Sequence, residues 1–336
     1  MRSDRVPARA LPGSMNGSPR RSCSHWVAIL LGGLLLSPAG VAAQALPFHT
    51  ETAITTGFEE EAARTFGLFA GRRGLSRNGA DVPDPTQRDV DMFVEPVVVL
   101  PYALTPMWTT RIIVPFVHKS MDFTAPDGLR ESYASSGVGD VIVDTKWIFL
   151  VRNRLGGTTR VGIEGGVEIP FGSTEATLPD GSIAPRSLQR GSGSWDFPFK
   201  ALFTMTEGHV GLLANVGYRL NTTDEGFKTG NVLSYDMAVG LRFFPWVYRT
   251  LRDQSLVAYL ELNGEVAARD HTAGTPDPNS GGHVLFLSPD LQWIPTAWLL
   301  FEGSVQLPIV QDLNGTQLKH DTRFQLGTRI RFSVFR

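Results

Sequence analysis

The feature that most constrains the fold is a two-residue alternation of apolar and polar side chains that recurs from about residue 61 to the end of the chain. In residues 301–309 the odd positions are apolar or glycine, and the even positions are polar or proline. Residues 322–334 show the same division, with most apolar side chains at even positions. Because successive side chains of a β-strand point to opposite faces, each segment predicts a strand with one apolar and one polar face.

About twelve such segments can be counted, and bacterial outer-membrane β-barrels have an even number of strands. The segments run to about ten residues or more, whereas strands of soluble proteins usually have about five or six. The first segment, near residues 61–71, has the weakest alternation and follows the acidic residues Glu59, Glu60 and Glu61.

The connections between these segments alternate in length. The short ones are residues 104–107, 153–157, 206–209 and 295–298, with a somewhat longer one at 245–255. The long ones are rich in Gly, Pro, Asp, Asn, Ser and Thr and fall at residues 72–88, 120–138, 173–191, 221–230, 270–282 and 311–319. Outer-membrane barrels have short periplasmic turns and longer extracellular loops, so this pattern places both chain termini on the periplasmic side.

Aromatic side chains gather near the short connections, as expected where amphipathic rings settle at the edge of a bilayer. They are Tyr102, Trp108, Phe243, Phe244, Trp246, Tyr248, Trp293, Trp298 and Phe332. We therefore expect an all-β fold, a transmembrane antiparallel β-barrel of about twelve strands. The alternative fold is a secreted soluble β-sandwich, whose strands also alternate.

Residues 1–43 have the pattern of a secretory signal peptide. Five arginines precede an apolar run from Trp26 to Leu36, and small residues ending at Ala42 and Ala43 follow it. The apolar run is shorter than the ~20 residues that a membrane-spanning helix needs. Cleavage after Ala43 or after Ala45 fits the small-residue rule, and either Met1 or Met15 can serve as the start. The expected location is the cell outer membrane.

Composition excludes several other classes of protein. A chain with 42% hydrophobic residues is too apolar to be disordered, and one cysteine cannot make an internal disulfide framework. A formal net charge of -2 offers no positive surface for nucleic acid.

The mature chain is expected to have two parts. Residues 44–60 form a periplasmic N-terminal segment or a plug that enters the barrel, and the sequence does not choose between them. Residues 61–336 form the barrel.

If the apolar faces contact lipid, the polar faces line the interior, where charges must be hydrated or paired. The interior is then a hydrated, weakly charge-selective path or a network of salt bridges that fills a narrow barrel. The candidate lumen-lining residues are Arg111, Lys146, Arg160, Glu164, Glu168, Asp236, Arg242, Glu261, Glu265, Glu302, Arg329 and Arg331.

The hypothesis that the protein is an enzyme depends on His118 and Ser120, which share a strand face and would contact lipid. A serine nucleophile needs a base and a third group that orients the imidazole, and no complete hydrolase signature accompanies this pair. His271, His283 and His320 fall in or beside loops without the spacing of metal ligands. We therefore expect no catalytic residue, no metal and no cofactor.

Four short motifs carry a family resemblance. They are Gly137-Val138-Gly139-Asp140, GGVEIPFG at residues 165–172, GSGSWD at 191–196 and LPIVQDLNG at 307–315. Together they resemble the outer-membrane β-barrel family named for the MetA, or meta-cleavage, pathway of phenol degradation. The resemblance covers most of the mature chain, implies transport of small organic compounds, aromatic or hydrophobic ones among them, and carries no catalytic motif.

The leading hypothesis is therefore an outer-membrane barrel for passive transport of a small organic solute. The alternatives are an outer-membrane lipid hydrolase that uses His118 and Ser120, and a structural barrel with a blocked lumen. The expected partners are outer-membrane lipid and lipopolysaccharide, the barrel-assembly machinery and the solute, and no nucleic acid.

Overall fold

The computed structural model describes residues 46–55, 60–125, 127–247, 250 and 253–333. The predicted signal peptide lies outside these residues. Among the residues described, no helix is long and apolar enough to cross a membrane.

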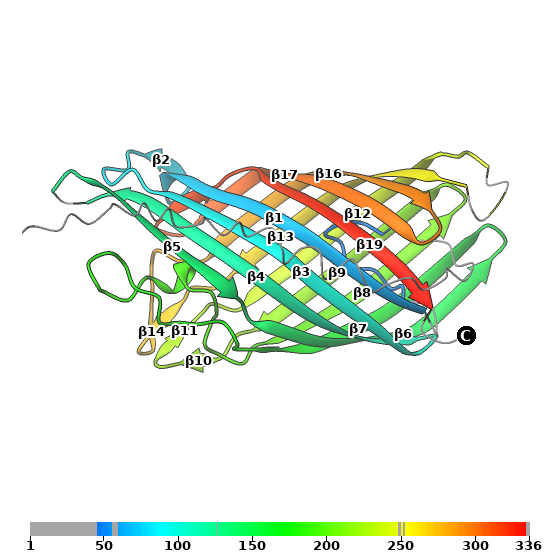
Figure 1. The fold of residues 1–336 in the computed structure, drawn as a ribbon, viewed down its shortest axis with the longest axis horizontal. Coiled ribbons are helices and arrows are strands. Elements are labelled where there is room, and N and C mark those ends of the chain that lie inside the picture. Colours follow the sequence, from blue (N-terminus) through cyan, green and yellow to red (C-terminus); the bar gives the residue numbers. More distant parts are fainter. Residues whose placement is uncertain (1–45, 56–59, 126, 248–249, 251–252, 334–336) are drawn as a thin grey trace, which may run out of the picture. The chain divides into compact units, whose positions relative to one another are not determined.

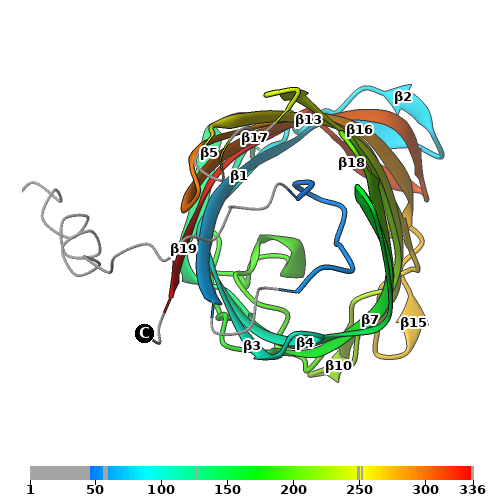
Figure 2. The same ribbon diagram turned by 90° about the vertical axis from the view of Figure 1, so that its right-hand side faces the viewer.

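Within this described part of the chain, twelve long antiparallel strands form a closed barrel (Figures 1 and 2). The strands are β1 Glu60–Arg77, β3 Asp89–Thr105, β4 Trp108–Thr124, β6 Val141–Arg154, β7 Gly157–Ile169, β8 Phe197–Glu207, β9 Val210–Leu220, β12 Val232–Phe244, β13 Ser255–Ala267, β16 Gly282–Thr296, β17 Leu299–Leu313 and β19 Arg323–Ser333. The ring closes because β1 pairs with both β3 and β19. The predicted fold class is confirmed, and the β-sandwich alternative is wrong.

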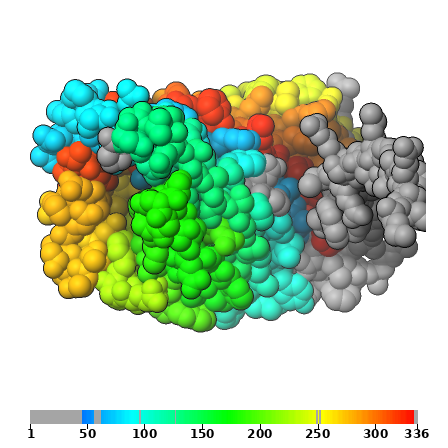
Figure 3. Space-filling model, turned by 60° about the vertical axis from the view of Figure 1, so that its left-hand side comes forward, coloured from blue at the N-terminus to red at the C-terminus, as the bar shows by residue number. Residues whose placement is uncertain are grey.

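The long connections carry short strands of their own. These are β2 Ala80–Val82, β5 Arg130–Val138, β10 Thr223–Asp224, β11 Phe227–Lys228, β14 His271–Thr272, β15 Thr275–Pro276 and β18 Thr316–His320, with a 3-10 helix η1 at Arg186–Leu188. In Figure 3 the cyan, green and gold connections gather at one end of the barrel. The start of β1 pairs with the end of β19, at the end of the barrel that holds the short turns.

The two faces of the strands divide as the alternation predicts. On β17 the side chains of Phe301, Leu307 and Ile309 are exposed on the outside, whereas Glu302 and Ser304 are buried inside. Tyr102, Trp108, Trp246 and Trp293 are also exposed near the short turns. A closed sheet with an apolar outer wall and a polar interior is the arrangement of an outer-membrane β-barrel, because the outer wall meets lipid and no backbone edge is left unpaired.

The weak pattern of the first strand has a structural cause. Phe66 of β1 packs edge-on against Phe48, with ring centroids 5.5 Å apart, and Phe48 precedes the barrel in the chain. A strand whose inner face packs partly on an apolar side chain cannot be polar throughout that face. The strand is also longer than the predicted 61–71, since β1 runs to Arg77 and pairs there with β2 and β18.

Three of the four family motifs, those at residues 137–140, 165–172 and 191–196, meet at the loop end of the barrel. The carboxylate of Asp140 accepts hydrogen bonds from the backbone N–H of Gly172 at 2.9 Å and of Ser192 at 2.6 Å. Gly172 and Gly191 lie so close that a Cβ on Gly172 would be 2.5 Å from the Cα of Gly191. These motif residues therefore join β6 to the long loop between β7 and β8, which is an architectural role.

The same loop packs against the long strands beside it. The ammonium of Lys119 on β4 donates to the backbone carbonyls of Ser187 at 3.0 Å and Gln189 at 2.6 Å. Leu188 packs in an apolar cluster with Tyr133 of β5 and Ala184. Since Lys119 shares its strand face with the inward-pointing Arg111, the loop approaches the interior of the barrel at this end.

Val239 lies near the middle of β12 and is 48% exposed on the outer wall. We expect Val239→Arg to lower the free energy of unfolding from lipid vesicles by about 2–4 kcal/mol, the cost of a cation at the bilayer midplane. Denaturant titration of the barrel in vesicles measures this, with Val239→Leu as the matched control. Equal stability of the arginine and leucine variants would contradict the assignment of this face to lipid.

Candidate functional site

The candidate site is built around residues 46–55, which we call the N-terminal segment. It lies inside the barrel (Figure 2) and contacts inward-facing side chains of strands far apart around the ring. The N–H of Ala53 donates to the Thr204 hydroxyl of β8 at 3.0 Å, and the Thr55 hydroxyl donates to the Pro106 carbonyl at 2.8 Å, in the turn after β3. This location favours the plug over the periplasmic tail.

Glu261 of β13 anchors the first part of this segment. One carboxylate oxygen accepts the N–H of Phe48 at 2.8 Å and of His49 at 3.1 Å. The other accepts the N–H of Thr50 at 2.6 Å and the hydroxyl of the same residue. A charged acceptor makes these hydrogen bonds stronger than neutral ones, and it satisfies backbone groups that have no strand partner.

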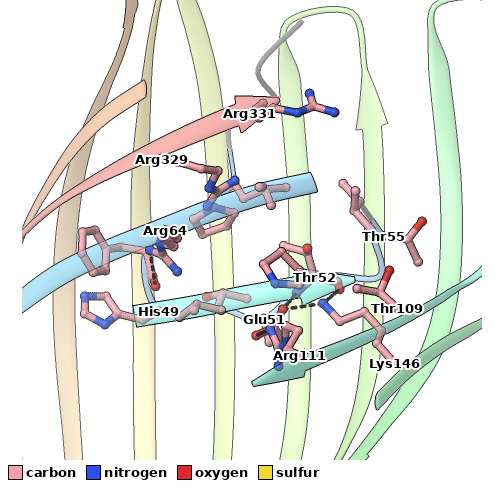
Figure 4. A pocket seen from close by; sticks show the side chains of 18 residues that line it. His49, Glu51, Thr52, Thr55, Arg64, Thr109, Arg111, Lys146, Arg329 and Arg331 are labelled. Carbon is pink, nitrogen blue, oxygen red and sulfur yellow. Dashed lines mark hydrogen bonds and ion pairs between the residues drawn. The ribbon is translucent and has the colours of Figure 1, made fainter. Parts of the chain in front are cut away.

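Glu51 anchors the second part through two cations (Figure 4). Its carboxylate lies 2.8 Å from Nη1 of Arg111 on β4 and also pairs with the ammonium of Lys146 on β6. The same ammonium donates to the carbonyl of Thr52 at 2.8 Å. Burial raises the pKa of Glu51, but Arg111 and Lys146 outweigh it and hold that pKa well below its usual range. Glu51 is therefore ionised at neutral pH.

The two cations also bind carboxylates of the wall. Arg111 holds Asp144 with Nη2 at 2.7 Å, and the same nitrogen lies 2.8 Å from Glu164 on β7. Gly166 leaves room for this cluster, because a Cβ there would lie 2.7 Å from the Cβ of Asp144. Part of the interior is thus a salt-bridge network, which was one of the two alternatives for the lumen.

Arg64 of β1 holds the segment from a third direction. Its Nε lies 2.7 Å from a carboxylate oxygen of Glu302 on β17, and its guanidinium carbon lies 4.8 Å from the ring centroid of Phe48. The guanidinium therefore pairs with a buried acid and stacks against an aromatic ring, a combination that suits arginine better than lysine.

A cavity of about 130 Å³ lies between the N-terminal segment and the wall formed by β19, β1, β3, β4 and β6 (Figure 4). Its apolar side includes Ile54, Ala62, Val99 and Pro101. Its charged side chains are Glu51, Arg64, Arg111, Lys146, Arg329 and Arg331. Five cations and one carboxylate therefore line one small space, together with a patch of apolar surface.

His49, Glu261 and Asp290 place potential ligand atoms within 4.8 Å of one another, the one such group found among the described residues. Both oxygens of Glu261 already accept hydrogen bonds from the N-terminal segment. The ring of His49 contacts the Ser304 hydroxyl at 2.9 Å. These groups are thus used to hold the segment, and we assign them to anchoring rather than to a metal.

The structure brings seven of the twelve predicted lumen-lining residues to the N-terminal segment, its anchors or the cavity, and the other five lie apart. Those that it brings together are Arg111, Lys146, Glu164, Glu261, Glu302, Arg329 and Arg331. Glu168 lies 3.6 Å from Arg219, Asp236 accepts a hydrogen bond from Asn263 at 3.0 Å, and Arg242 contacts His209 at 3.1 Å. Arg160 makes a long contact of 3.4 Å with Thr158, and Glu265 is exposed. A role in conduction stays a prediction for all twelve.

The histidine of the enzyme alternative contacts a different serine. Nδ1 of His118 lies 2.6 Å from the hydroxyl of Ser136, its cross-strand partner on β5. Among the described residues, His118 makes no hydrogen bond to Ser120 or to a carboxylate that would orient the ring. The pair therefore has the geometry of an ordinary cross-strand contact.

Sequence reasoning missed His49, Glu51 and Arg64 as site residues. His49 and Glu51 precede the first strand, in a stretch without periodicity, and Arg64 stands in the segment with the weakest alternation. A signal was present: an acidic residue, a histidine and hydroxyl side chains follow one another at residues 49–52, and these groups suit contacts with a charged interior.

Comparison with known proteins agrees with this fold. The family model described as "Putative MetA-pathway of phenol degradation" matches residues 97–309. The crystal structure of the COG4313 outer membrane channel from Pseudomonas putida F1 is 14% identical, with a TM-score of 0.61 over 86% of this chain and 100% of the channel. The CymD monoaromatic hydrocarbon channel is 7% identical, with a TM-score of 0.37 over 84% of this chain and 90% of its own. No curated protein sequence matches the chain.

Replacing Glu51 with glutamine should loosen the N-terminal segment, because two buried cations lose a charged partner. We expect the backbone amides of residues 48–53 to exchange with deuterium at least about tenfold faster, which corresponds to about 1.4 kcal/mol of lost protection. The control is Glu175→Gln, in the long loop and exposed. Unchanged exchange in Glu51→Gln would show that the Arg111 and Lys146 contacts do not hold the segment.

Acid should release the first part of the segment through His49. Burial is the main cause that lowers the pKa of His49 to about 4, against 6.5 in a free histidine. The charged or titratable groups around it are Glu261, Asp290, Glu302, Arg64 and Arg323. Since the docked state favours the neutral ring, docking is strongest above pH 6.5 and weakens as the pH falls toward 4.

The measurement is the fluorescence of an environment-sensitive label on Leu46→Cys, which lies in the first part of the segment. We expect the label to become more mobile below about pH 6.5 in the otherwise native chain, and the change to disappear in His49→Gln. Glu51 stays ionised through this range because its pKa is lowered. A pH response that persists in His49→Gln would assign it to another group.

Proposed function

The chain belongs to the family described as "Putative MetA-pathway of phenol degradation", and on that premise we propose that it is an outer-membrane channel for passive diffusion of small organic compounds, aromatic or hydrophobic ones among them. The observation that carries the proposal is the interior. Charged and polar side chains line a closed barrel, and the N-terminal segment that crosses it is held by hydrogen bonds and ion pairs.

Such contacts suit a removable plug. Glu261 and Glu51 hold the segment at two separate places, and each contact can break without disturbing the hydrogen bonds of the wall. A solute that enters from the loop end would pass the loop around η1 and then the N-terminal segment before it leaves at the end with the short turns. Passage requires the segment to move, so the channel is closed at rest and opens transiently.

The outer wall fits a lipid environment, since its exposed side chains are mostly apolar. Contact with membrane lipid follows from this surface. Recognition by the barrel-assembly machinery and contact with lipopolysaccharide belong to the same proposal, because a bacterial barrel of this kind needs the first to insert and meets the second at its extracellular end.

The second candidate is a structural barrel with a blocked lumen. It is favoured by the density of ion pairs around Arg111, which bridges Glu51, Asp144 and Glu164. The two candidates differ in one property. A blocked barrel keeps its segment docked and does not conduct, whereas a channel conducts and responds to loss of the segment.

The test is single-channel conductance in a planar bilayer. We expect small, intermittent steps for the native chain and larger, longer openings after deletion of residues 46–55, because the segment occupies the lumen and supplies the Glu51 contacts. The Glu51→Gln variant should open more often than the native chain. The control variant Glu175→Gln should open as often as the native chain does. A barrel that inserts but conducts in neither the native nor the deleted form would exclude the channel and favour the structural barrel.

A further inference from the structure

The long loop between β7 and β8 folds over the loop end of the barrel instead of projecting away from it. Leu188 is 2% exposed and packs with Tyr133 of β5. Val90 of β3 and Met121 of β4 pack against the same cluster. Val90 and Met121 are cross-strand partners, and Met121 shares its strand face with Lys119, so these are inward-facing positions. The loop therefore covers part of the mouth, and Figure 2 shows the green part of it within the ring of strands.

Residues 173–190, which we call the lid, hold together as one unit. The side chain of Gln189 is fully buried and crosses the lid. Its amide oxygen accepts the N–H of Ala176 at 3.0 Å, and its amide nitrogen donates to the carbonyls of Ala176 and Ala184, both at 2.9 Å. The N–H of Ala184 also donates to the carbonyl of Ala176 at 2.9 Å. Because these hydrogen bonds lie within the lid, the lid can move without losing them.

The lid joins the barrel through a narrow neck. A Cβ on Gly172 would lie 2.5 Å from the Cα of Gly191, so the two ends of the lid are in contact. The carboxylate of Asp140 accepts the N–H of Gly172 at 2.9 Å and of Ser192 at 2.6 Å, which fixes the neck to the start of β6. A unit with its own hydrogen bonds on a narrow neck can rotate as one body, as lids that close over binding sites do.

Two cations hold the lid against the rest of the barrel. The ammonium of Lys119 donates to the carbonyls of Ser187 at 3.0 Å and Gln189 at 2.6 Å. Nη2 of Arg186 lies 3.0 Å from the carboxylate of Asp224, in the hairpin formed by β10 and β11. The side chains of this ion pair are 22% and 26% exposed, so water reaches both. Each of these contacts can break without the loss of a hydrogen bond between strands.

We propose that the lid is a gate at the loop end of the barrel, latched by Lys119 and by the Arg186–Asp224 ion pair. The pathway then has two barriers in series, because a solute that enters from the loop end meets the lid first and the N-terminal segment second. The inference deepens the proposed function and rests on it only for the role of the lid in solute entry. Access to the interior can be measured without transport.

The test is the reaction rate of a cysteine placed between the two barriers. Ala238 of β12 pairs with the anchor Glu261, and Asp236 is the next inward-facing position toward the loop end and is partly exposed. The one cysteine of the chain, Cys23, lies in the predicted signal peptide, so Asp236→Cys supplies the one thiol of the mature protein. The rate is measured on the full-length mature protein in detergent, with the small charged reagent (2-sulfonatoethyl) methanethiosulfonate.

We expect Lys119→Met to raise this rate at least about tenfold, because methionine has a similar length and donates no hydrogen bond to the lid. Asp224→Asn should raise it by a smaller factor, since a partly exposed ion pair is lost while Lys119 stays in place. The matched control is Lys319→Met, which removes an ion pair with Asp81 outside the lid and should leave the rate of Asp236→Cys unchanged. Heat-modifiable migration on gels identifies the variants that have folded.

An unchanged rate in folded Lys119→Met would overturn the proposal, and so would an equal rise in Lys319→Met. If Lys119→Met does not fold, an unchanged rate in Asp224→Asn has the same meaning. Because the reaction needs no flux, its outcome is independent of conductance. A faster reaction in a barrel that never conducts would leave the lid and reject the channel, whereas conductance with unchanged rates would do the reverse.

Discussion

The structure depends on the requirement that every backbone N–H and C=O inside a bilayer find a partner within the protein. The chain meets it by joining its first long strand to its last: residues 60–69 of β1 pair with residues 324–333 of β19. Without this seam, two sheet edges would face lipid. Once β1 and β19 are paired, one face of every strand contacts lipid and must be apolar. The other face surrounds a common interior.

Much of the fold could be predicted from the sequence because a closed barrel repeats one rule in every strand. The short turn at residues 153–157 and the long loop at 173–191 were recognisable from turn residues and from the strands on either side. The length of β1 was not, since its last residues extend the wall by pairing with β2 in a tight hairpin and with β18 in a distant part of the chain. Such pairing depends on contacts between loops, which no periodicity records.

The site was only partly predictable for a related reason. Arg111, Lys146, Glu164 and Glu261 stand at polar positions of well-patterned strands, and alternation alone points them inward. Their partners were harder to find, because Glu51 reaches Arg111 across 60 positions of sequence and lies in a stretch without secondary structure. The alternation of apolar and polar residues indicates which way a side chain faces. The identity of its partner depends on how the irregular N-terminal segment fills the interior of the barrel.

The positions of the segment's anchors also constrain the order in which the molecule can assemble. Thr204, Glu261 and Asp290 belong to β8, β13 and β16, so the first residues of the mature barrel obtain their binding partners only when strands from the later part of the chain have formed. The seam between β1 and β19 needs the last strand of all. If β1 and β19 pair last, the N-terminal segment can first bind across the open sheet and is then enclosed when the barrel closes. If the barrel closes first, the segment has to enter through one end.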